Sequence, residues 1–185
     1  MGDLVIGLMG QSGSGKTTIA KELEKRGYKI VHSYTTREPR ESNEWGHTFI
    51  EDDLELTEED IEGTPSVIAW SRYNENLYWA EINQIKDKGI SIYIIDPLGF
   101  LRMKKIEKSR EFNSLGIYLS ASDMTRAERM QKDGREKAEI LERLEFDKSM
   151  FDIVMTDYVI NAEGDILTIA DKIERIINFR YLNIV

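Results

Sequence analysis

The residues from Gly10 to Thr17 have the types and the spacing needed to hold phosphate groups. They read Gly-Gln-Ser-Gly-Ser-Gly-Lys-Thr and fit the pattern Gly-x-x-x-x-Gly-Lys-Ser/Thr. Glycines let such a loop curl with its N–H groups pointing inward, and the helix that follows adds the positive end of its dipole. Lys16 would supply a mobile cation for the outer phosphates, and the Thr17 hydroxyl would hold Mg²⁺. The alternative is a glycine-rich turn that only caps a helix, but such a turn would rarely match the full pattern by chance. The predicted nucleotide-binding residues are Gly10, Ser12, Gly13, Ser14, Gly15, Lys16, Thr17 and Thr18.

A second candidate for metal chemistry is Asp96, which ends the apolar run Ile90–Ile95. A carboxylate in this place would lie at the carboxyl edge of a buried strand, where open α/β sheets bind their ligands. We therefore predict that Asp96 acts with Thr17 at the Mg²⁺ site. The alternative is a helix cap ahead of Pro97. Asp96–Gly99 also fits the Asp-x-x-Gly pattern of GTPase switches, but no Asn-Lys-x-Asp sequence follows it, which weakens that interpretation.

Two arginines three residues apart, Arg37 and Arg40, flank a proline in the segment Ser33–Arg40. Proline stiffens the backbone, and a guanidinium binds two phosphate oxygens at once while it keeps its charge. The pair is therefore a candidate for gripping a second phosphate group. The alternative is that both arginines lie on the surface and pair with Glu38 and Glu41.

These residues need elements that bring them together, and the pattern of the chain predicts an α/β fold. Short apolar runs alternate with segments of helical period, which is typical of parallel strands joined by crossover helices. The first and third runs are almost wholly apolar, as in strands covered on both faces. We expect a five-stranded parallel sheet made of the strands Leu4–Met9, Tyr28–His32, Ile90–Ile95, Ser114–Leu119 and Tyr158–Ile160. We expect helices at Lys16–Arg26, Ala80–Lys88, Phe100–Lys108, Asp123–Met130, Ala138–Phe151 and Asp165–Arg180.

The segment 34–79 interrupts this alternation and is typical of an inserted lobe. It contains two short strand-like pieces, His47–Ile50 and Ser66–Ser71, on either side of an acidic patch at Glu51–Glu62. Inside the patch, Leu54–Ile61 has apolar ends seven residues apart and a threonine ahead of three acids. Threonine is a good helix cap and acids suit the first turn, so we expect a short helix there.

The net charge of −9 arises from one part of the chain, because Glu41–Ser71 holds ten acidic residues and no Lys or Arg. A chain of this charge is poorly suited to nucleic acids, which need a basic surface to displace counterions. The absence of cysteine excludes disulfides, thiolate zinc sites and a cysteine nucleophile. No apolar run approaches the roughly 18 residues of a membrane span, and the first residues lack a signal-peptide pattern. We therefore expect a cytoplasmic protein that binds small phosphorylated molecules and neither nucleic acids nor membranes.

The sequence resembles the guanylate kinase family of nucleoside monophosphate kinases along most of its length. The family's segment Ser-x-x-Thr-Arg-x-Pro-Arg is matched by Ser33 and Thr36–Arg40. Further matches are the phosphate loop, the inserted lobe with Trp70 and Tyr78, the strand that ends at Asp96, an arginine-rich lid and the strand Val159–Asn161.

The resemblance implies a fold, an activity and a division of the chain. The implied fold is the three-layer fold of P-loop NTPases, with a core domain at residues 1–33 and 80–185 and a lid at about 126–143. Residues 34–79 would form the inserted lobe that binds the acceptor. The implied activity is transfer of the γ-phosphoryl group of ATP, with Mg²⁺, to GMP, dGMP or a related nucleoside monophosphate.

The resemblance also implies roles for single residues. Matches to the acceptor site are Ser33, Arg37, Arg40, Tyr78 and Asp96, with either His47 or Phe49 in the place of an aromatic hydroxyl. Asn161 matches the ATP side, and Arg143 matches a lid arginine, while Arg126, Arg129 and Arg135 compete for the remaining lid role. Catalysis would then fall to Lys16, Arg37, Arg40, Arg129, Arg135 and Arg143. Cations brought in by a closing lid would stabilise the charge that spreads over the transferring group. The alternative is that the lid arginines pair on helix surfaces with Glu139, Glu142 and Asp147.

The sequence departs from the family at the positions that would read guanine. Ala69 replaces a glutamate, Ala80 replaces a small hydroxyl residue, Trp79 replaces a glycine, and Ile94 replaces the first of two aspartates. Loss of two hydrogen bonds to a charged group would remove about 1.5 to 3 kcal/mol each from guanine discrimination. Three interpretations stay open: a nucleoside monophosphate kinase, a kinase with a rebuilt acceptor site for another metabolite, and a non-catalytic binding module. The intact phosphate loop favours an enzyme, and the apolar residues Phe179–Val185 leave a monomer or a homodimer open.

Overall fold

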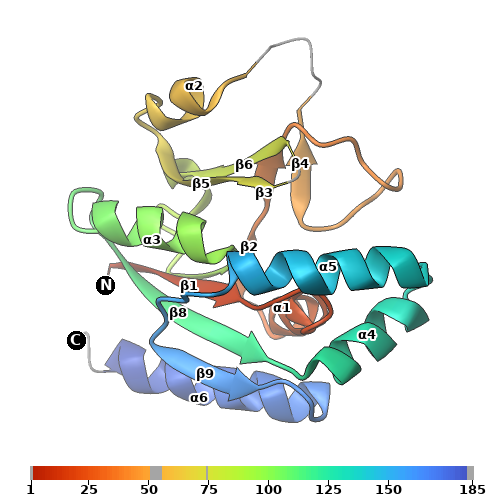
Figure 1. Ribbon diagram of the computed structural model, residues 1–185. Coiled ribbons are helices and arrows are strands. Elements are labelled where there is room, and N and C mark those ends of the chain that lie inside the picture. Colours follow the sequence, from red (N-terminus) through yellow and green to blue (C-terminus); the bar gives the residue numbers. More distant parts are fainter. Residues whose placement is uncertain (1, 51–55, 74, 183–185) are drawn as a thin grey trace.

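The computed structural model describes residues 2–50, 56–73 and 75–182, which form two β-sheets and the helices around them (Figure 1). None of the helices in these ranges is long and apolar enough to cross a membrane. In chain order the elements are β1 (Asp3–Met9), α1 (Lys16–Lys25), β2 (Lys29–Val31), β3 (Ser33–Thr35), β4 (His47–Phe49), α2 (Glu58–Glu62), β5 (Val67–Tyr73), β6 (Asn76–Glu81), the 3₁₀ turn η1 (Ile82–Gln84), β7 (Ile90–Ile94), α3 (Pro97–Ile106), β8 (Phe112–Ser120), α4 (Asp123–Lys132), α5 (Lys137–Met150), β9 (Tyr158–Asn161) and α6 (Ile166–Leu182).

The central sheet has five parallel strands in the order β2-β7-β1-β8-β9. Successive residues of β1 face two different apolar clusters. Leu4, Ile6 and Leu8 pack in the cluster that α1 and α6 cover, whereas Val5 and Met9 pack in the one that α3 covers. Because both faces of the strand are buried, all its core residues are apolar, as its sequence predicts. The expected α/β fold with a five-stranded parallel sheet is confirmed.

The order of the strands places the phosphate loop at the ligand-binding edge of the sheet. The chain leaves β1 for β2 and β7 on one side, and later returns to β8 and β9 on the other side. Ligands of open α/β sheets bind at the carboxyl ends of the strands, where this order reverses. The loop after β1 and the turn after β7 therefore open onto the same edge.

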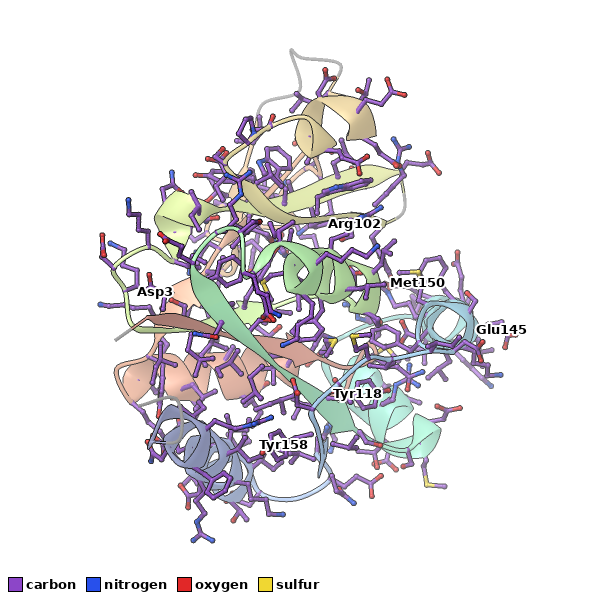
Figure 2. The ribbon with its side chains drawn as sticks, turned by 90° about the vertical axis from the view of Figure 1, so that its left-hand side faces the viewer. Asp3, Arg102, Tyr118, Glu145, Met150 and Tyr158 are labelled. Atoms are coloured by element: carbon purple, nitrogen blue, oxygen red, sulfur yellow. The ribbon has the colours of Figure 1, made fainter. Side chains whose placement is uncertain are left out.

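The second sheet has the order β4-β3-β6-β5, with one parallel pair, β3 and β4. Its own apolar cluster contains Trp70, Leu77 and Trp79, which pack with Ile61 of α2. Helix α3 joins this sheet to the core. Arg102, labelled in Figure 2, extends from α3. Its guanidinium carbon lies 3.3 Å from the centre of the Trp70 ring, and it donates a 2.8 Å hydrogen bond to the Trp70 carbonyl oxygen.

The expected helix at Ala80–Lys88 is wrong, and the strands β3 and β6 were not expected. Ala80 and Glu81 end β6, and only the 3₁₀ turn Ile82–Gln84 follows. β6 pairs with β5 on one side and β3 on the other, and β3 begins only two residues after β2. Pairing with strands distant in sequence overrides the local preference for a helix here.

Two further helices differ from the expectation at their ends. Helix α3 begins at Pro97, three residues before the expected start, because the Asp96 side chain caps it. The expected short helix in Leu54–Ile61 is present as Glu58–Glu62, where Thr57 forms a capping box with Asp60. Leu54 lies outside the described residues.

Two glycines face each other in the centre of the sheet, because Gly7 of β1 pairs with Gly116 of β8. Phe100 of α3 lies across both. A Cβ atom would stand 2.5 Å from the Phe100 ring at Gly7 and 2.9 Å from it at Gly116. Glycine inside a strand often marks such a close approach. The two glycines therefore let α3 lie close to the sheet, next to the turn that carries Asp96.

We expect Gly7→Ala to lower the free energy of unfolding by about 1 to 3 kcal/mol, because the added methyl group overpacks the contact with Phe100. Urea unfolding followed by circular dichroism measures the change. The matched control is Gly164→Ala, where a Cβ atom would meet nothing within 4 Å. Equal stability of the two variants would show that Phe100 moves aside without cost.

Candidate active site

The phosphate loop joins the buried end of β1 to the first turn of α1. Gly13 and Gly15 have φ angles of 75° and 97°, a region that other residues rarely adopt. A Cβ atom on Gly13 would also lie 2.6 Å from the Arg126 carbonyl oxygen. The backbone of α4 thus packs directly against the loop. These two glycines are required by the fold of the loop as well as by the phosphates it could hold.

A cavity of about 660 Å³, here called the loop cavity, opens at the N-terminus of α1. The Ser14 hydroxyl is buried and has no hydrogen-bond partner within the described part of the chain. Unsatisfied polar groups and a helix N-terminus lined by cations suit a polyphosphate. The wall of the loop cavity includes Ser12 to Ile19, the cations Arg129, Lys132, Arg135 and Arg143, and the turn residues Ala162, Gly164, Asp165 and Ile166.

Lys16 lines the loop cavity. Its Nζ atom donates hydrogen bonds to the carbonyl oxygens of Gly10 at 2.6 Å and Gln11 at 3.1 Å. Burial lowers the pKa of Lys16 from 10.5 to about 8, with a smaller lowering by Arg126 and Arg143 and an opposing effect of Asp147. No salt bridge neutralises Lys16 in the described structure, so its charge is available to a phosphate.

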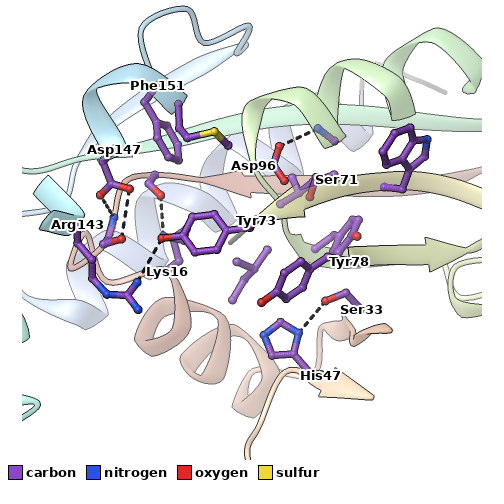
Figure 3. A pocket seen from close by; sticks show the side chains of 18 residues that line it. Lys16, Ser33, His47, Ser71, Tyr73, Tyr78, Asp96, Arg143, Asp147 and Phe151 are labelled. Atoms are coloured by element: carbon purple, nitrogen blue, oxygen red, sulfur yellow. Dashed lines mark hydrogen bonds between the residues drawn. The ribbon is translucent and has the colours of Figure 1, made fainter. Parts of the chain in front are cut away.

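A second cavity of about 230 Å³, here called the lobe cavity, lies between the second sheet and the core. Figure 3 shows its side chains pointing toward a common space. Ser12, Lys16 and Arg143 line both cavities. The two cavities therefore meet at these residues. The second sheet and the segment around it contribute Ser33, His47, Trp70, Ser71, Tyr73 and Tyr78 to the wall, and the core contributes Asp96, Asp147, Met150 and Phe151 among others.

On the side of the second sheet, the wall of the lobe cavity carries a neutral hydrogen-bonding pair, Ser33 and His47. The Ser33 hydroxyl lies 2.8 Å from Nδ1 of His47, and the His47 ring contacts Tyr78 edge-on. Burial, together with the charges of Arg37 and Arg40, lowers the pKa of His47 to about 4. His47 is therefore neutral at neutral pH and can only donate or accept hydrogen bonds there.

Arg37 and Arg40 approach the site without lining either cavity. Arg37 pairs with Glu44 at 2.6 Å and lies over the Phe49 ring at 5.3 Å. Arg40 is an exposed residue. Its pKa is lowered, first because part of the side chain is shielded from water and second because the charges of Arg37, Arg143 and Arg135 repel it. The charge of Arg40 is thus close enough to those of Arg37, Arg143 and Arg135 to be repelled by all three. This positive cluster suits an anionic ligand.

The lid arginines make three different kinds of contact. Arg129 donates to the carbonyl oxygens of Gly13 and Ser14 at 3.3 and 3.2 Å, and to that of Ala162 at 2.7 Å, so it lines the loop cavity. Arg135 and Arg143 both pair with Glu139, Arg143 through its Nε atom at 3.0 Å. The Nη1 atom of Arg143 also donates a 3.3 Å hydrogen bond to the Tyr73 hydroxyl. Arg126 is buried and lines neither cavity.

Asp96 lines the lobe cavity and Thr17 lines the loop cavity, so the structure does not bring them together at the expected Mg²⁺ site. Oδ1 of Asp96 accepts hydrogen bonds from the N–H groups of Leu98 and Gly99, both at 2.9 Å, so the cap is present. Among residues 2–50, 56–73 and 75–182, no cluster of three acidic, His or Cys side chains could hold a metal ion. Thr17 would share Mg²⁺ with phosphate oxygens and water, which is how this ion is usually held.

Asn161 also lies outside the wall of the loop cavity. Its side chain accepts a 2.8 Å hydrogen bond from the N–H group of Glu163 and shapes the turn that follows β9. The next residues of that turn, Ala162 and Gly164, are the ones that line the cavity.

Sequence reasoning missed Tyr73 and Phe151 of the lobe cavity and misplaced Asp147. The sequence suggests Asp147 only as a surface partner for arginines, but it is buried beside the phosphate loop. One available signal was its position four residues after Arg143, which places both on one face of a helix. Tyr73 carries no local signal, because its contacts with Ser12 and Arg143 are long-range.

Comparison with known proteins places the chain in a family. A family model described as an AAA domain matches residues 6–149. The chain belongs to this AAA domain family. No curated protein matches this AAA domain chain.

Solved structures show the same fold at low sequence identity. The guanylate kinase from Anaplasma phagocytophilum is 18% identical, with a TM-score of 0.64, over 97% of this chain and 86% of the other. A gluconokinase from Sinorhizobium meliloti 1021 is 16% identical, with a TM-score of 0.51, over 98% of this chain and 97% of the other. The AAA domain chain therefore has a P-loop kinase-like α/β fold.

We expect the affinity for Mg²⁺-ADP to fall as the pH rises through about 8. Because the pKa of Lys16 is lowered from 10.5 to about 8, the amine is charged below that pH and loses its attraction for phosphate above it. Calorimetric titration from about pH 7 to about pH 9 measures the effect. In Lys16→Arg the guanidinium stays charged, so its affinity should show no break in this range. A wild-type affinity that does not change with pH would contradict the expectation.

Proposed function

We propose that the protein is a phosphotransferase that moves the γ-phosphoryl group of ATP from the loop cavity to an acceptor in the lobe cavity. The observation that carries this proposal is the meeting of the two cavities at Ser12, Lys16 and Arg143. A donor phosphate and an acceptor oxygen placed on either side of this junction would face each other. Holding two reactants in this way supplies much of the catalysis in phosphoryl transfer.

The residues of the chain would act by position and charge. The loop N–H groups and Lys16 would hold the donor phosphates, and Arg143, Arg135 and Arg129 would stabilise charge on the transferring group. Mg²⁺, held by Thr17, would neutralise the β- and γ-phosphates. An acceptor oxygen attacks the γ-phosphorus, the bond to the β–γ bridging oxygen breaks, and ADP leaves. No covalent enzyme intermediate is needed.

A nucleoside monophosphate is the acceptor that the lobe cavity supports best. Arg37 and Arg40 bring two guanidinium groups to the side of the cavity where Ser33, His47 and Tyr78 offer neutral hydrogen bonds. Such a set fits a phosphate dianion. The likeness of the fold to a guanylate kinase agrees with this choice. We place the acceptor-binding lobe at residues 34–79.

The base of the acceptor would meet a mainly apolar wall. The apolar part of the cavity wall comes from Trp70, Ile94, Ile95, Met150 and Phe151. Ala69 and Ala80 are cross-strand partners buried in the cluster that α3 covers, and neither lines the lobe cavity. Ile94 lines the cavity in the place of a carboxylate, which leaves Asp96 as the acidic group on this side of the base. GMP and dGMP are candidates if Asp96 reads the guanine edge. A different base is expected if the apolar wall decides.

A phosphoryl-transfer assay with ATP and Mg²⁺ against GMP, dGMP, AMP, CMP, UMP and dTMP tests the proposal. We expect turnover of at least one of these acceptors and its loss in Lys16→Ala. Turnover of gluconate or another phosphate-free metabolite instead would show a rebuilt acceptor site. Binding of ATP with no transfer to any acceptor would contradict an enzyme and favour a binding module.

We expect Arg143→Ala to lower kcat about 100-fold to 1,000-fold, because a cation that stabilises the transferring group is lost. The control is Arg110→Ala, which removes an exposed arginine after α3 and should leave kcat unchanged. Steady-state kinetics at saturating ATP and acceptor measures both. A change in KM with an unchanged kcat would show that Arg143 only binds the substrates.

A further inference from the structure

A buried ion pair holds the phosphate loop at Ser12, one of the residues where the two cavities meet. Arg126 of α4 is 0% exposed and Asp147 of α5 is 2% exposed, and the two side chains form an ion pair. The second partner of Arg126 is Asp123, at 2.8 Å, on the surface. Two opposite charges from two different helices are thus enclosed beside a loop that is rich in glycine.

Both members of the ion pair form hydrogen bonds with the same loop residue, Ser12. The N–H group of Ser12 donates to Oδ2 of Asp147 at 2.7 Å, and the Ser12 carbonyl oxygen accepts from Nε of Arg126 at 2.8 Å. The Ser12 hydroxyl lies 3.3 Å from Oδ1 of Asp147. Both backbone groups of Ser12, the N–H donor and the carbonyl acceptor, are therefore held by the ion pair.

Stability alone does not explain this arrangement. A buried ion pair is often no more stabilising than apolar side chains of the same size. Glycine contributes no side chain that could fix the loop, so contacts from neighbouring helices must fix it. Asp147 lies one helical turn after Arg143 on α5, on the same helix face. The helix that holds Ser12 is thus the helix that brings Arg143 to the junction of the cavities.

We propose that Arg126 and Asp147 are positioning residues that fix the backbone of Ser12 in the conformation that binds nucleotide and tie it to the helix that carries Arg143. This inference rests on the proposed function. Arg126 lines neither cavity, and Asp147 lines only the lobe cavity, so neither faces the cavity of the donor phosphates. Their effect reaches the nucleotide through the loop.

Two variants separate positioning from stability. In Asp147→Asn, the amide oxygen can still accept from Ser12 and Arg126, but the charge that balances Arg126 is gone. In Arg126→Met combined with Asp147→Leu, no buried charge remains and the volume is similar, but Ser12 has lost both contacts. The measurements are thermal unfolding and calorimetric titration with Mg²⁺-ADP.

We expect one variant to lose thermal stability and the other to lose affinity for Mg²⁺-ADP. Asp147→Asn should unfold at a lower temperature yet bind Mg²⁺-ADP within about threefold of the wild type. The double variant should unfold close to the wild-type temperature yet bind Mg²⁺-ADP at least about tenfold more weakly, as expected for loss of a hydrogen bond to a charged group. A merely structural pair would give affinities that follow stability. The control is Asp123→Ala, which removes the exposed partner of Arg126 and should leave the affinity unchanged.

Wild-type affinity in the double variant would overturn the positioning role and leave the proposed function standing. Absence of Mg²⁺-ADP and ATP binding by the wild type would overturn both. If the double variant does not fold, Arg126→Lys decides, because a single ammonium group cannot reach Ser12 and Asp147 as the forked guanidinium does. We expect that variant to bind Mg²⁺-ADP at least about fivefold more weakly, and an unchanged affinity would overturn the proposal.

Discussion

The structure depends on holding a glycine-rich loop in one conformation at the carboxyl edge of a parallel sheet. Such a loop has high conformational entropy and few side chains to restrain it. The restraint comes from three directions: β1 is buried on both faces, α4 packs its backbone against Gly13, and Arg126 and Asp147 hold Ser12. Ser12 and Lys16, two of the three residues at which the cavities meet, belong to this loop.

The charges around the loop explain why the site suits phosphate. Lys16 is half-buried and donates hydrogen bonds to carbonyl oxygens, and the charge of Arg40 is repelled by those of Arg37, Arg135 and Arg143. The nearby carboxylates of Glu44, Glu139 and Asp147 neutralise only part of this charge. A polyphosphate and an acceptor phosphate would complete the neutralisation, so ligand binding relieves a repulsion that the folded protein already carries.

The second sheet is attached to the core in a way that lets it complete the site. Arg102 fixes β5 to α3 through Trp70, and Tyr73 at the far end of β5 reaches Ser12 and Arg143. One strand thus spans from the packed support to the junction of the two cavities. An acceptor held by this sheet would be placed relative to the donor loop by the same strand.

The sequence by itself determined the α/β class, the central strands and the phosphate loop, because these depend on local signals: apolar runs buried on both faces, glycine spacing, and a lysine at a helix start. Tertiary structure alone decided that residues 76–81 form a strand, since pairing with β5 and β3 outweighs local helical preference. It also decided that Asp96 caps α3 away from Thr17, and that Asp147 is a buried partner of Ser12. These outcomes arise from contacts between residues far apart in the chain, whose energies no local pattern of residues records.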